Sequence, residues 1–569
     1  MPKIDVNEEL FFRTLGRRFE KDELETLLTT AKAELDDWPR GEGILRIELN
    51  DTNRPDLWST LGLARQLSIY LTGKVPSYPF FSRPGAAAKA TGDRRVVVDK
   101  GLKDIRPYIG SFVAEGREVT DALLREIIQS QEKLCGNFGR KRKTIAMGVS
   151  RADLITWPVS YSAADPDKTK FIPLDFHKPM SMRQILTEHP KGKEYGPIVA
   201  AFARFPLLAD GKGEVLTFPP VINSALIGGV KTGDTRLFID LTGPDLDTIL
   251  TACAITACDF ADMGFRVLPV AVEYPFDTPY GRTIVTPYYF QKETALDAAD
   301  AGRRLGEELT AEQAAESIRR MGNGARVEGT RVVVTPPEYR NDFLHPVDAI
   351  EEIMIGRGMD SFTPVMPRDF TVGRISDAEE YGRRVREIMI GLGYQEMIYG
   401  YLGSRRDLVE RMGTDGSDAI EIANPMTESF NMVRNSILPN LLMSEAESAH
   451  ATYPHRIFEI GKTVVKDPSD NSGTRTDNTL GFLLADREAG FNEVDAHALA
   501  LFYYLSLEPK LAPLDDPRFI PGRAASIRVH GRVVGIMGEV HPQVLAAWGI
   551  EMPCAAVELR LDFMRGGRS

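Results

Sequence analysis

The chain has 569 residues, of which 43% are hydrophobic and 26% charged, and its formal net charge is −12. This apolar content can fill several cores, and a chain of this length is expected to divide into about three to five domains. The acidic balance excludes a protein that wraps nucleic acid indiscriminately, although a local basic surface can still meet a phosphate backbone.

The sequence carries no evident targeting or redox signal. Residues Met1 to Glu25 interleave charges and lack the apolar core of a signal peptide, and the longest weakly polar run, near Ile249 to Cys258, is too short to span a bilayer. The four cysteines form no CxxC pair and the eight histidines are scattered, which argues against zinc. We therefore expect a cytoplasmic protein with no membrane association.

The first domain is expected at residues 1–105, with mixed helix and strand patterns. The amphipathic stretch Asp22 to Leu35 predicts a helix, and the alternating stretch Ile44 to Leu49 predicts a strand. Residues Asn53 to Asp56 suit a tight turn that opens a helix as far as Leu71. A stretch rich in proline, glycine and alanine, Phe81 to Gly92, has the composition of a linker.

The second domain, residues 106–275, is expected to be α/β with its own core. Long helices are predicted at Thr120 to Leu134 and at Leu246 to Met263. Strands are predicted at Ile109 to Val113, Thr144 to Val149 and Leu237 to Gly243.

Two further domains are expected after residue 275. Residues 276–362 predict a small helix-rich module, with helices at Lys292 to Gly302 and at Thr310 to Met321 and a strand at Arg331 to Thr335. Residues 363–569 begin with a long helix, Ser376 to Leu392, and continue with many strands separated by turns. The predicted fold class is therefore a multidomain α+β and α/β protein whose last domain is antiparallel α+β.

The most informative segment of the sequence is the acidic stretch Tyr339 to Ile353. Pro346 suits the first turn of a helix, and Asp348, Glu351 and Glu352 stand at positions i, i+3 and i+4, so their side chains are neighbours on that helix. Asp342 lies just ahead of the helix. Grouped carboxylates suit Mg²⁺, but an acidic face in water is the alternative. Because Ile355 falls within the carboxylate arc, we expect this face to be covered.

Several motifs taken in chain order resemble one family, the β subunit of phenylalanyl-tRNA synthetase, in its shorter archaeal and eukaryotic form. Each motif is weak alone, but their order is specific. The motifs are Asn53-Arg-Pro-Asp56, Gly62-Leu-Ala-Arg65, Gln131-Glu-Lys-Leu134, Arg140-Lys-Arg142, Phe218-Pro-Pro-Val-Ile-Asn223, Asp240-Leu-Thr-Gly243, Arg340-Asn-Asp-Phe-Leu-His-Pro-Val-Asp348, Glu351-Glu352, Ile422-Ala-Asn-Pro425, Arg434-Asn-Ser-Ile-Leu-Pro439, Phe458-Glu-Ile-Gly461, Phe519-Ile-Pro-Gly-Arg523 and Gly538-Glu-Val-His-Pro542.

The resemblance implies a subunit of phenylalanine–tRNA ligase that does not itself aminoacylate. Its four domains are then an N-terminal B1-type domain, a B3/B4-type editing domain, a B5-type domain and a degenerate class II catalytic-like domain. The family pairs with an α subunit in an (αβ)₂ tetramer that binds tRNA(Phe), and ATP and phenylalanine bind through α. After Leu561 the sequence leaves no room for the anticodon-reading domain of the long bacterial form.

The resemblance also implies two sets of site residues. The family's magnesium ligands correspond to Asp342, Asp348, Glu351 and Glu352, which we expect near the contact between α and β. The editing domain hydrolyses tyrosine wrongly attached to the phenylalanine tRNA, and its candidate residues are Thr217, Asn223, Asp240 and Thr242. Thr242 also suits a helix cap, and Pro244 stands where many relatives have a hydroxyl residue.

Other readings of the chain remain open at this point. Arg140 to Lys143 can meet tRNA phosphates or form a solvated edge, and Arg434 to Pro439 suits a packed strand end. Cys253 and Cys258 are expected to pack within a helix. A free-standing aminoacyl-tRNA deacylase and a noncatalytic RNA-binding scaffold are the alternative functions.

Overall fold

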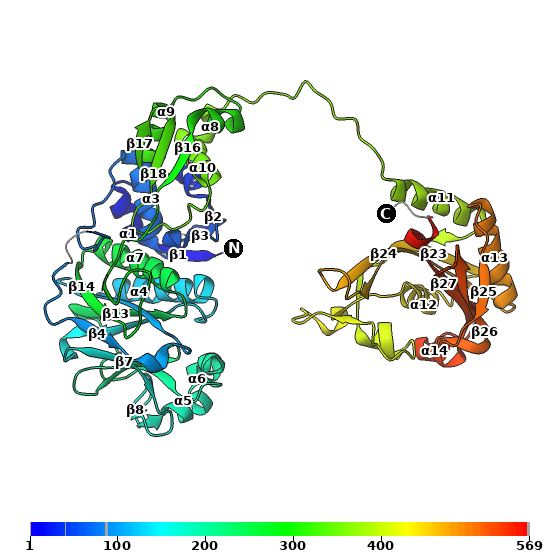
Figure 1. The fold of residues 1–569 in the computed structure, drawn as a ribbon, viewed down its shortest axis with the longest axis horizontal. Helices are drawn as coiled ribbons and strands as arrows, with labels where there is room; N and C mark the ends of the chain where they lie inside the picture. Colours follow the sequence, from blue (N-terminus) through cyan, green and yellow to red (C-terminus); the bar gives the residue numbers. More distant parts are fainter. Residues whose placement is uncertain (1, 40, 86–88, 566–569) are drawn as a thin grey trace. The chain divides into compact units, whose positions relative to one another are not determined.

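The computed structural model describes residues 2–39, 41–85 and 89–565, and the chain divides into two compact units, Met1–Val365 and Met366–Ser569 (Figure 1). Each unit has its own sheets and hydrophobic cores. Within these ranges, no helix has the length and apolar character that a membrane span requires. The predicted multidomain α+β and α/β fold class is confirmed.

The N-terminal unit begins with a three-stranded antiparallel sheet in the order β1-β3-β2. Its core includes Phe11, Leu24 and Ile47. The elements are β1 (Lys3–Asn7), α1 (Glu8–Leu15), α2 (Lys21–Leu28), β2 (Ala33–Asp37), β3 (Ile44–Leu49) and α3 (Thr60–Thr72).

The helix predicted for Asp22 to Leu35 is too long. Helix α2 ends at Leu28, a 3₁₀ turn follows, and Lys32 has a φ of 50°. This left-handed backbone stops the helix, and the next residues pair with β3 as strand β2. Strand pairing therefore overrides the amphipathic pattern.

A ten-stranded sheet forms the centre of the N-terminal unit, with nine strands in the order β12-β11-β10-β7-β4-β14-β5-β13-β6 and β15 beside β14. Helices α4 and α7 pack on β5, β6 and β13 and bury Phe112, Ile239 and Phe260 in one core. The elements are β4 (Arg95–Val98), β5 (Tyr108–Glu115), α4 (Asp121–Lys133), β6 (Ala146–Arg151), β7 (Val159–Ala164), β10 (Phe205–Ala209), β11 (Val215–Phe218), β12 (Ile222–Asn223), β13 (Arg236–Gly243), α7 (Leu246–Asp262), β14 (Arg266–Glu273) and β15 (Thr283–Thr286).

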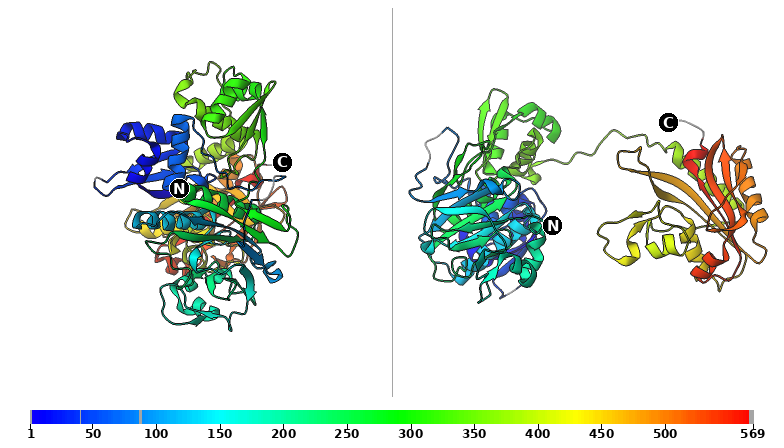
Figure 2. Two further views of the ribbon diagram at one scale, coloured as in Figure 1. Left: turned by 90° about the vertical axis from the view of Figure 1, so that its left-hand side faces the viewer. Right: turned by 60° about the horizontal axis from the view of Figure 1, so that its bottom comes forward.

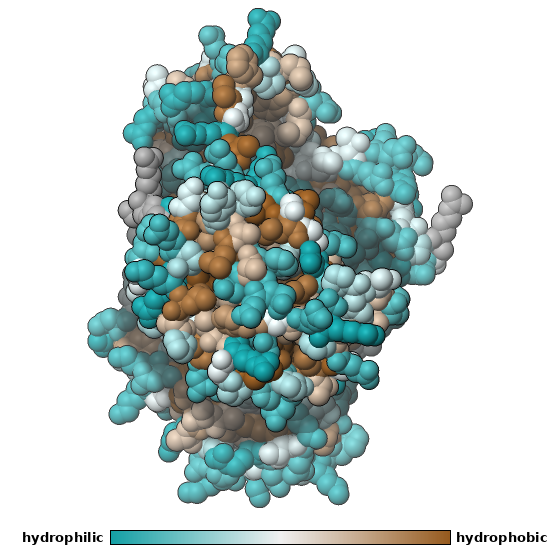
Figure 3. Space-filling view, turned by 90° about the vertical axis from the view of Figure 1, so that its right-hand side faces the viewer, coloured by the Kyte–Doolittle hydropathy of each residue, from teal (hydrophilic) through white to brown (hydrophobic). Residues whose placement is uncertain are grey.

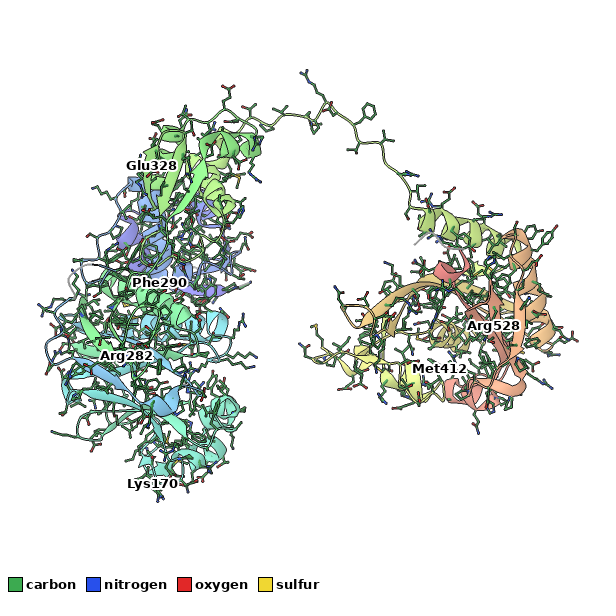
Figure 4. All side chains as sticks on the ribbon, in the orientation of Figure 1. Lys170, Arg282, Phe290, Glu328, Met412 and Arg528 are labelled. Atoms are coloured by element: carbon green, nitrogen blue, oxygen red, sulfur yellow. The ribbon has the colours of Figure 1, made fainter. Side chains whose placement is uncertain are left out.

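A small lobe is inserted between β7 and β10 and lies at one end of the unit (Figure 1, Figure 2). Lys170, labelled in Figure 4, marks its first strand. Phe171, Met182 and Phe218 share a core, so the lobe packs on the β11–β12 end of the large sheet. Its elements are β8 (Lys170–Phe171), β9 (Met180–Ser181), α5 (Met182–Glu188) and α6 (Pro190–Tyr195).

The last part of the N-terminal unit is a helix-rich module on a three-stranded sheet, in the order β16-β18-β17. The helix predicted from Lys292 starts later, because residues 294–297 form a strand and the Asp297 side chain caps α8. The elements are β16 (Thr294–Asp297), α8 (Ala298–Leu305), α9 (Ala311–Arg320), β17 (Gly324–Glu328), β18 (Arg331–Thr335) and α10 (Pro346–Arg357).

The C-terminal unit is built on a seven-stranded sheet in the order β19-β23-β24-β28-β27-β26-β25, with a smaller sheet in the order β20-β22-β21. Its pairs are antiparallel except β19 with β23, and the predicted long first helix is present as α11. The elements are α11 (Asp377–Gly391), β19 (Gln395–Glu396), β20 (Leu402–Gly403), β21 (Ile420–Glu421), β22 (Met432–Val433), α12 (Leu438–Glu447), β23 (His455–Lys466), β24 (Thr474–Ala485), α13 (Phe491–Tyr504), β25 (Lys510–Pro513), β26 (Phe519–Val529), β27 (Arg532–Val540), α14 (Pro542–Trp548), β28 (Cys554–Arg560) and α15 (Leu561–Met564).

Arg434 is a packed strand end, as the sequence suggested. Its side chain is 1% exposed, and its Nη1 and Nη2 donate to the two carboxylate oxygens of Glu459 at 2.7 and 2.9 Å. Gly461 makes room for this pair, because a Cβ there would lie 2.2 Å from Nη2 of Arg434. The pair is held inside the unit and its charges are matched.

The face drawn in Figure 3 is largely hydrophilic, with hydrophobic residues in several small groups. Scattered apolar side chains are normal on a protein surface.

Candidate functional site

A buried carboxyl group on β13 lies at the centre of the candidate site. Asp240 pairs with Ser111 of β5 and with Gly148 of β6, so it stands between two strands of the large sheet. Gly148 leaves space for it, since a Cβ at that position would lie 2.5 Å from Oδ1 of Asp240. Glycine inside a strand is unusual and marks such a close approach.

Asp240 has no compensating charge. The residue is 1% exposed, and its Oδ1 has no hydrogen-bond partner among the described residues. Burial alone raises the pKa of this carboxyl to about 7. Keeping a buried polar atom unsatisfied costs free energy, so a partner from outside the chain is the natural complement.

Asp240 lines a cavity of about 160 Å³ together with two of the other predicted editing residues. Thr217 and Asn223 are paired across the β11–β12 hairpin, whose Pro219-Pro220 turn forms part of the wall. The lining residues are Gln131, Arg142, Ala146, Met147, Gly148, Leu174, Asp175, Lys191, Thr217, Pro219, Pro220, Val221, Ile222, Asn223 and Asp240.

Thr242 does not join this cavity. Nε of Arg106 donates to its hydroxyl oxygen at 2.9 Å, and the side chain is fully buried. The alternative role of Thr242 as a helix cap is wrong, because Asp245 caps α7 by accepting from the N–H of Thr248. Thr242 instead anchors the buried guanidinium of Arg106 against the end of β13.

Sequence reasoning did not single out Gly148 or Lys191, and it named Gln131 only as part of a family motif, although all three line the cavity. A glycine within the stretch Thr144 to Val149, predicted as a strand, was the one available signal for Gly148. Lys191 carries no distinctive local pattern, and only the fold brings it to the same place as Gln131.

Two of the four predicted magnesium ligands are held by one arginine. Arg340, 2% exposed, donates from Nε and Nη2 to Asp342 at 3.0 and 2.6 Å, and from Nη1 and Nη2 to Glu352 at 2.8 and 3.0 Å. Burial of Asp342 opposes ionisation, but the charge of Arg340 outweighs it and lowers the pKa of that carboxyl. A second arginine lies beside the same carboxylate, with Nη1 of Arg54 at 3.9 Å from Oε1 of Glu352.

The other two predicted ligands have separate partners. Oδ2 of Asp348 accepts from the backbone N–H groups of Leu344 and His345 at 2.8 and 2.7 Å, which caps α10. Oε1 of Glu351 lies 2.6 Å from Nζ of Lys32, which also pairs with Asp51.

These carboxylates do not fit a magnesium site in this arrangement, since each is already matched by a cation or by backbone donors. Over the described ranges, no group of three or more histidine, cysteine, aspartate or glutamate side chains is placed to hold a metal ion. The expectation that the helix face is covered is met at Ile355, which is 8% exposed.

The C-terminal unit has larger cavities, of about 420 and 220 Å³, which share the lining residues Asp418, Asn435, Ser436 and Arg518. Met412, labelled in Figure 4, lines the larger one. Arg518 is already matched, because its Nε and Nη2 donate to the carboxylate of Asp516 at 2.9 and 2.6 Å. A nucleotide phosphate would have to compete with that pair.

Cys253 and Cys258 are both fully buried in α7, as expected for helix packing. Cys253 lies in the core that α7 forms with β5 and β13, and Cys258 lies in a smaller cluster with Tyr78 and Tyr339. Neither is placed at the candidate cavity.

Three family models match separate parts of the chain. Residues 1–73 match the Phe-tRNA synthetase beta subunit B1 domain, residues 294–359 the tRNA synthetase B5 domain, and residues 363–561 the phenylalanyl tRNA synthetase beta chain CLM domain.

Full-length relatives and a solved structure agree with these matches. The phenylalanine–tRNA ligase beta subunit of Borrelia turicatae is 45% identical over 563 residues, covering 99% of each chain. That of Treponema pallidum is 45% identical over 597 residues, covering 98% of this chain and 99% of the relative. An N-terminal fragment of the phenylalanyl-tRNA synthetase β subunit from Pyrococcus horikoshii matches with a TM-score of 0.58 and 34% identity, over 63% of this chain and 100% of the fragment. The chain therefore belongs to the phenylalanine–tRNA ligase beta subunit family of aminoacyl-tRNA synthetases.

Proposed function

We propose that this chain supports a catalytic α subunit in an (αβ)₂ phenylalanine–tRNA ligase and hydrolyses tyrosine wrongly esterified to tRNA(Phe). ATP and phenylalanine bind to α, and the β chain contributes tRNA-binding surface and the editing cavity. The observation that carries the editing role is the unpartnered carboxyl of Asp240 at a cavity beside Thr217 and Asn223.

Tyrosine differs from phenylalanine by one hydroxyl, and an apolar pocket rejects such an added group by only about 10²-fold. A second, hydrolytic site that selects for the hydroxyl corrects the remaining errors. A carboxyl group serves this purpose because its ionised form accepts a hydrogen bond from the phenol and its neutral form both donates and accepts. With a pKa raised to about 7 by burial, Asp240 offers both forms near neutral pH.

The size of the cavity suits a side chain and not a whole aminoacyl-nucleoside. Its volume of about 160 Å³ is well below the roughly 300–1,000 Å³ of sites that enclose drug-sized ligands. The phenol therefore enters toward Asp240, while the ester and the nucleotide stay at the mouth.

We also propose the module boundaries 1–105, 106–275, 276–362 and 363–569, and the shorter archaeal and eukaryotic form of the subunit. Support for that form is the similarity of its N-terminal part to the Pyrococcus horikoshii fragment. The bacterial relatives are matched over 99% of their length and so have a size similar to this chain. Chain length therefore does not distinguish an archaeal or eukaryotic form from these bacterial relatives.

The isolated chain should form no phenylalanyl-adenylate, because Arg434 and Arg518 are committed to Glu459 and Asp516. Adding the α subunit should restore phenylalanine charging and yield a complex with the mass of two copies of each chain. Adenylate-dependent pyrophosphate exchange and native mass measurement check both points. Exchange catalysed by the purified single chain would refute the supporting role.

Asp240→Ala in the assembled ligase should slow deacylation of preformed tyrosyl-tRNA(Phe) about tenfold or more, since a hydrogen bond to a buried group contributes about 1–3 kcal/mol. Phenylalanine charging should stay at the native rate because its chemistry lies in α. Asp245→Asn is the matched control, since asparagine also caps a helix. Equal deacylation by native and Asp240→Ala ligase would remove Asp240 from the site.

The raised pKa of Asp240 also predicts a pH dependence of stability. The folded state holds this proton more tightly than the unfolded state, so its contribution is greatest below the unfolded pKa near 4 and is lost as pH rises to about 7. Asp240→Asn should therefore be more stable than the native chain at pH 8, with the difference shrinking toward pH 4. Thermal unfolding of both proteins across this range is the measurement. A constant difference at all pH values would mean that Asp240 ionises normally.

Magnesium binding at Asp342, Asp348, Glu351 and Glu352 has only the family resemblance behind it, and we assign the segment an ion-pair role instead. Glu352→Gln should lower the free energy of unfolding by about 3 kcal/mol, because it leaves Arg340 buried with one partner fewer. Glu351→Gln should change it by less than about 1 kcal/mol, because the Glu351 side chain is 46% exposed.

Both variants are compared by urea unfolding with Mg²⁺ and with a chelator. The expected losses are the same in the two buffers. If Mg²⁺ stabilises the native chain and this gain disappears in Glu352→Gln, the segment binds the cation and the ion-pair assignment is wrong.

A further inference from the structure

A hairpin near the edge of the seven-stranded sheet carries two exposed arginines on either side of its turn. It joins β26 to β27 through the sequence Arg528-Val-His-Gly-Arg532, and His530 and Gly531 have φ values of 48° and 80°. A two-residue turn with both φ values positive matches the twist of a hairpin. The two arginines, of which Arg528 is labelled in Figure 4, are therefore fixed close together by the backbone.

The edge strand β25 adds a like charge directly opposite Arg528. Lys510 is the partner of Arg528 in the β25–β26 pairing, and both residues are exposed. Like charges that face each other on neighbouring strands lower stability. Lys510 and Pro513 on an edge strand suit protection of the open edge against pairing with another chain. That protection requires no second cation on β26, so it does not explain Arg528.

Arg532 belongs to a group of three arginines around one aromatic ring. The Cζ atoms of Arg475, Arg532 and Arg560 lie 5.2, 5.3 and 5.7 Å from the ring centre of Phe563. Arg475 and Arg560 share the carboxylate of Asp477, at 2.8 and 3.5 Å. Cation–π contacts with the ring hold the guanidinium groups in place and leave their N–H groups available to another partner.

Three of these neighbouring cations are unmatched. Among the residues that the structure describes, Lys510, Arg528 and Arg532 have no carboxylate within ion-pair distance and make no side-chain hydrogen bond. Arg523, on the same strand as Arg528, instead pairs with Glu539 at 2.6 Å. We call Lys510, Arg528 and Arg532 the basic edge. In a chain with a formal net charge of −12, this surface is a local site of positive potential.

The arrangement of the basic edge fits a row of anions and not one small anion. Its three cations lie on three successive strands, β25, β26 and β27, which stand about 4.8 Å apart. Each arginine offers paired donors that match the oxygens of a phosphate. The sugar–phosphate backbone of a nucleic acid presents such anions in succession, and contacts to it position the molecule without reading its sequence.

We propose that the basic edge binds the sugar–phosphate backbone of tRNA. The inference rests on the proposed function, in which the β chain contributes tRNA-binding surface. It assigns one such surface to the C-terminal unit, whereas the editing cavity belongs to the N-terminal unit. Bound phosphates also relieve the repulsion between Lys510 and Arg528, which the chain itself leaves uncompensated.

The test compares Arg528→Gln and Arg532→Gln with Arg523→Gln in the assembled ligase. Each change removes one exposed arginine from β26 or β27, but Arg523 is already matched by Glu539. Binding of uncharged tRNA(Phe) and of an unrelated tRNA is measured by fluorescence titration from low to moderate salt. Native mass measurement checks that each variant still assembles with α.

Arg528→Gln and Arg532→Gln should each weaken tRNA binding about threefold to tenfold at low salt. The slope of the log binding constant against log salt should become shallower by about 0.9 in each variant, the value for one phosphate contact with a duplex. Both tRNAs should show the same loss, because the backbone is common to them. Arg523→Gln should behave like the native ligase.

Equal weakening by Arg523→Gln would overturn the proposal, because the effect would then be general charge attraction. A loss confined to one of the two tRNAs would also overturn it, since a backbone contact does not depend on sequence. Normal tRNA binding together with loss of α would assign the basic edge to a protein contact instead. Because Arg532 packs on Phe563, Arg532→Lys is the second variant, and it should keep the native salt slope. A slope as shallow as that expected for Arg532→Gln would contradict the role of the charge.

The binding assay also separates this inference from the proposed function, because it requires neither charging nor deacylation. A native ligase that leaves tyrosyl-tRNA intact, but loses tRNA affinity only in Arg528→Gln and Arg532→Gln, would refute editing and support the contact. If the chain does not assemble with α, the full β chain is titrated alone. A shallower slope in these two variants then supports the contact, and unchanged slopes overturn it.

Discussion

The buried carboxyl group of Asp240 is the constraint on which the candidate site of the N-terminal unit depends. Asp240 lies on β13 between β5 and β6, in a position where an aliphatic side chain would pack without cost. The fold accommodates the acid in two ways: its pKa rises to about 7, and Gly148 opposite it has no side chain. A buried acid and a glycine within a strand both lower stability. Such costs are expected where a ligand supplies the hydrogen-bond partner that the carboxyl group lacks.

Two of the buried arginines show the opposite arrangement. Arg340 is bound by Asp342 and Glu352, and Arg434 is bound by Glu459, so each of these two buried cations has its carboxylate. Such pairs repay part of the desolvation that burial imposes. Asp342, Glu352 and Glu459 are thus matched by arginine, whereas Oδ1 of Asp240 has no partner among the described residues.

Sequence patterns predicted the helices and strands better than the side-chain contacts between them. The period of residues 346–357 identifies α10 and places three carboxylates on neighbouring positions, but it cannot show that Arg340 inserts between Asp342 and Glu352. Thr217 and Asn223 lie at the opposite end of the strand order from Asp240, and they meet it because β12 reaches β6, where Nδ2 of Asn223 donates to Val149 O at 3.2 Å. Thr242, two residues beyond Asp240, is instead bound by Arg106, whose role no local pattern announces. The family resemblance gave the four candidate editing residues, and contacts between distant elements show which three of them line one cavity.

The two units thus differ in whether their buried charged groups are already bound within the chain. In the C-terminal unit the class II-like sheet is intact, yet Arg434 and Arg518 are each bound to a carboxylate of the same chain. Stabilising a triphosphate requires cations whose charge is directed at the ligand, because an arginine matched internally contributes little to it. The N-terminal unit instead keeps a carboxyl group at a cavity, and Oδ1 of this group has no hydrogen-bond partner among the described residues. An unpaired carboxyl group at a small cavity suits the phenol of the proposed substrate, whereas arginines that are matched within the chain do not suit a triphosphate.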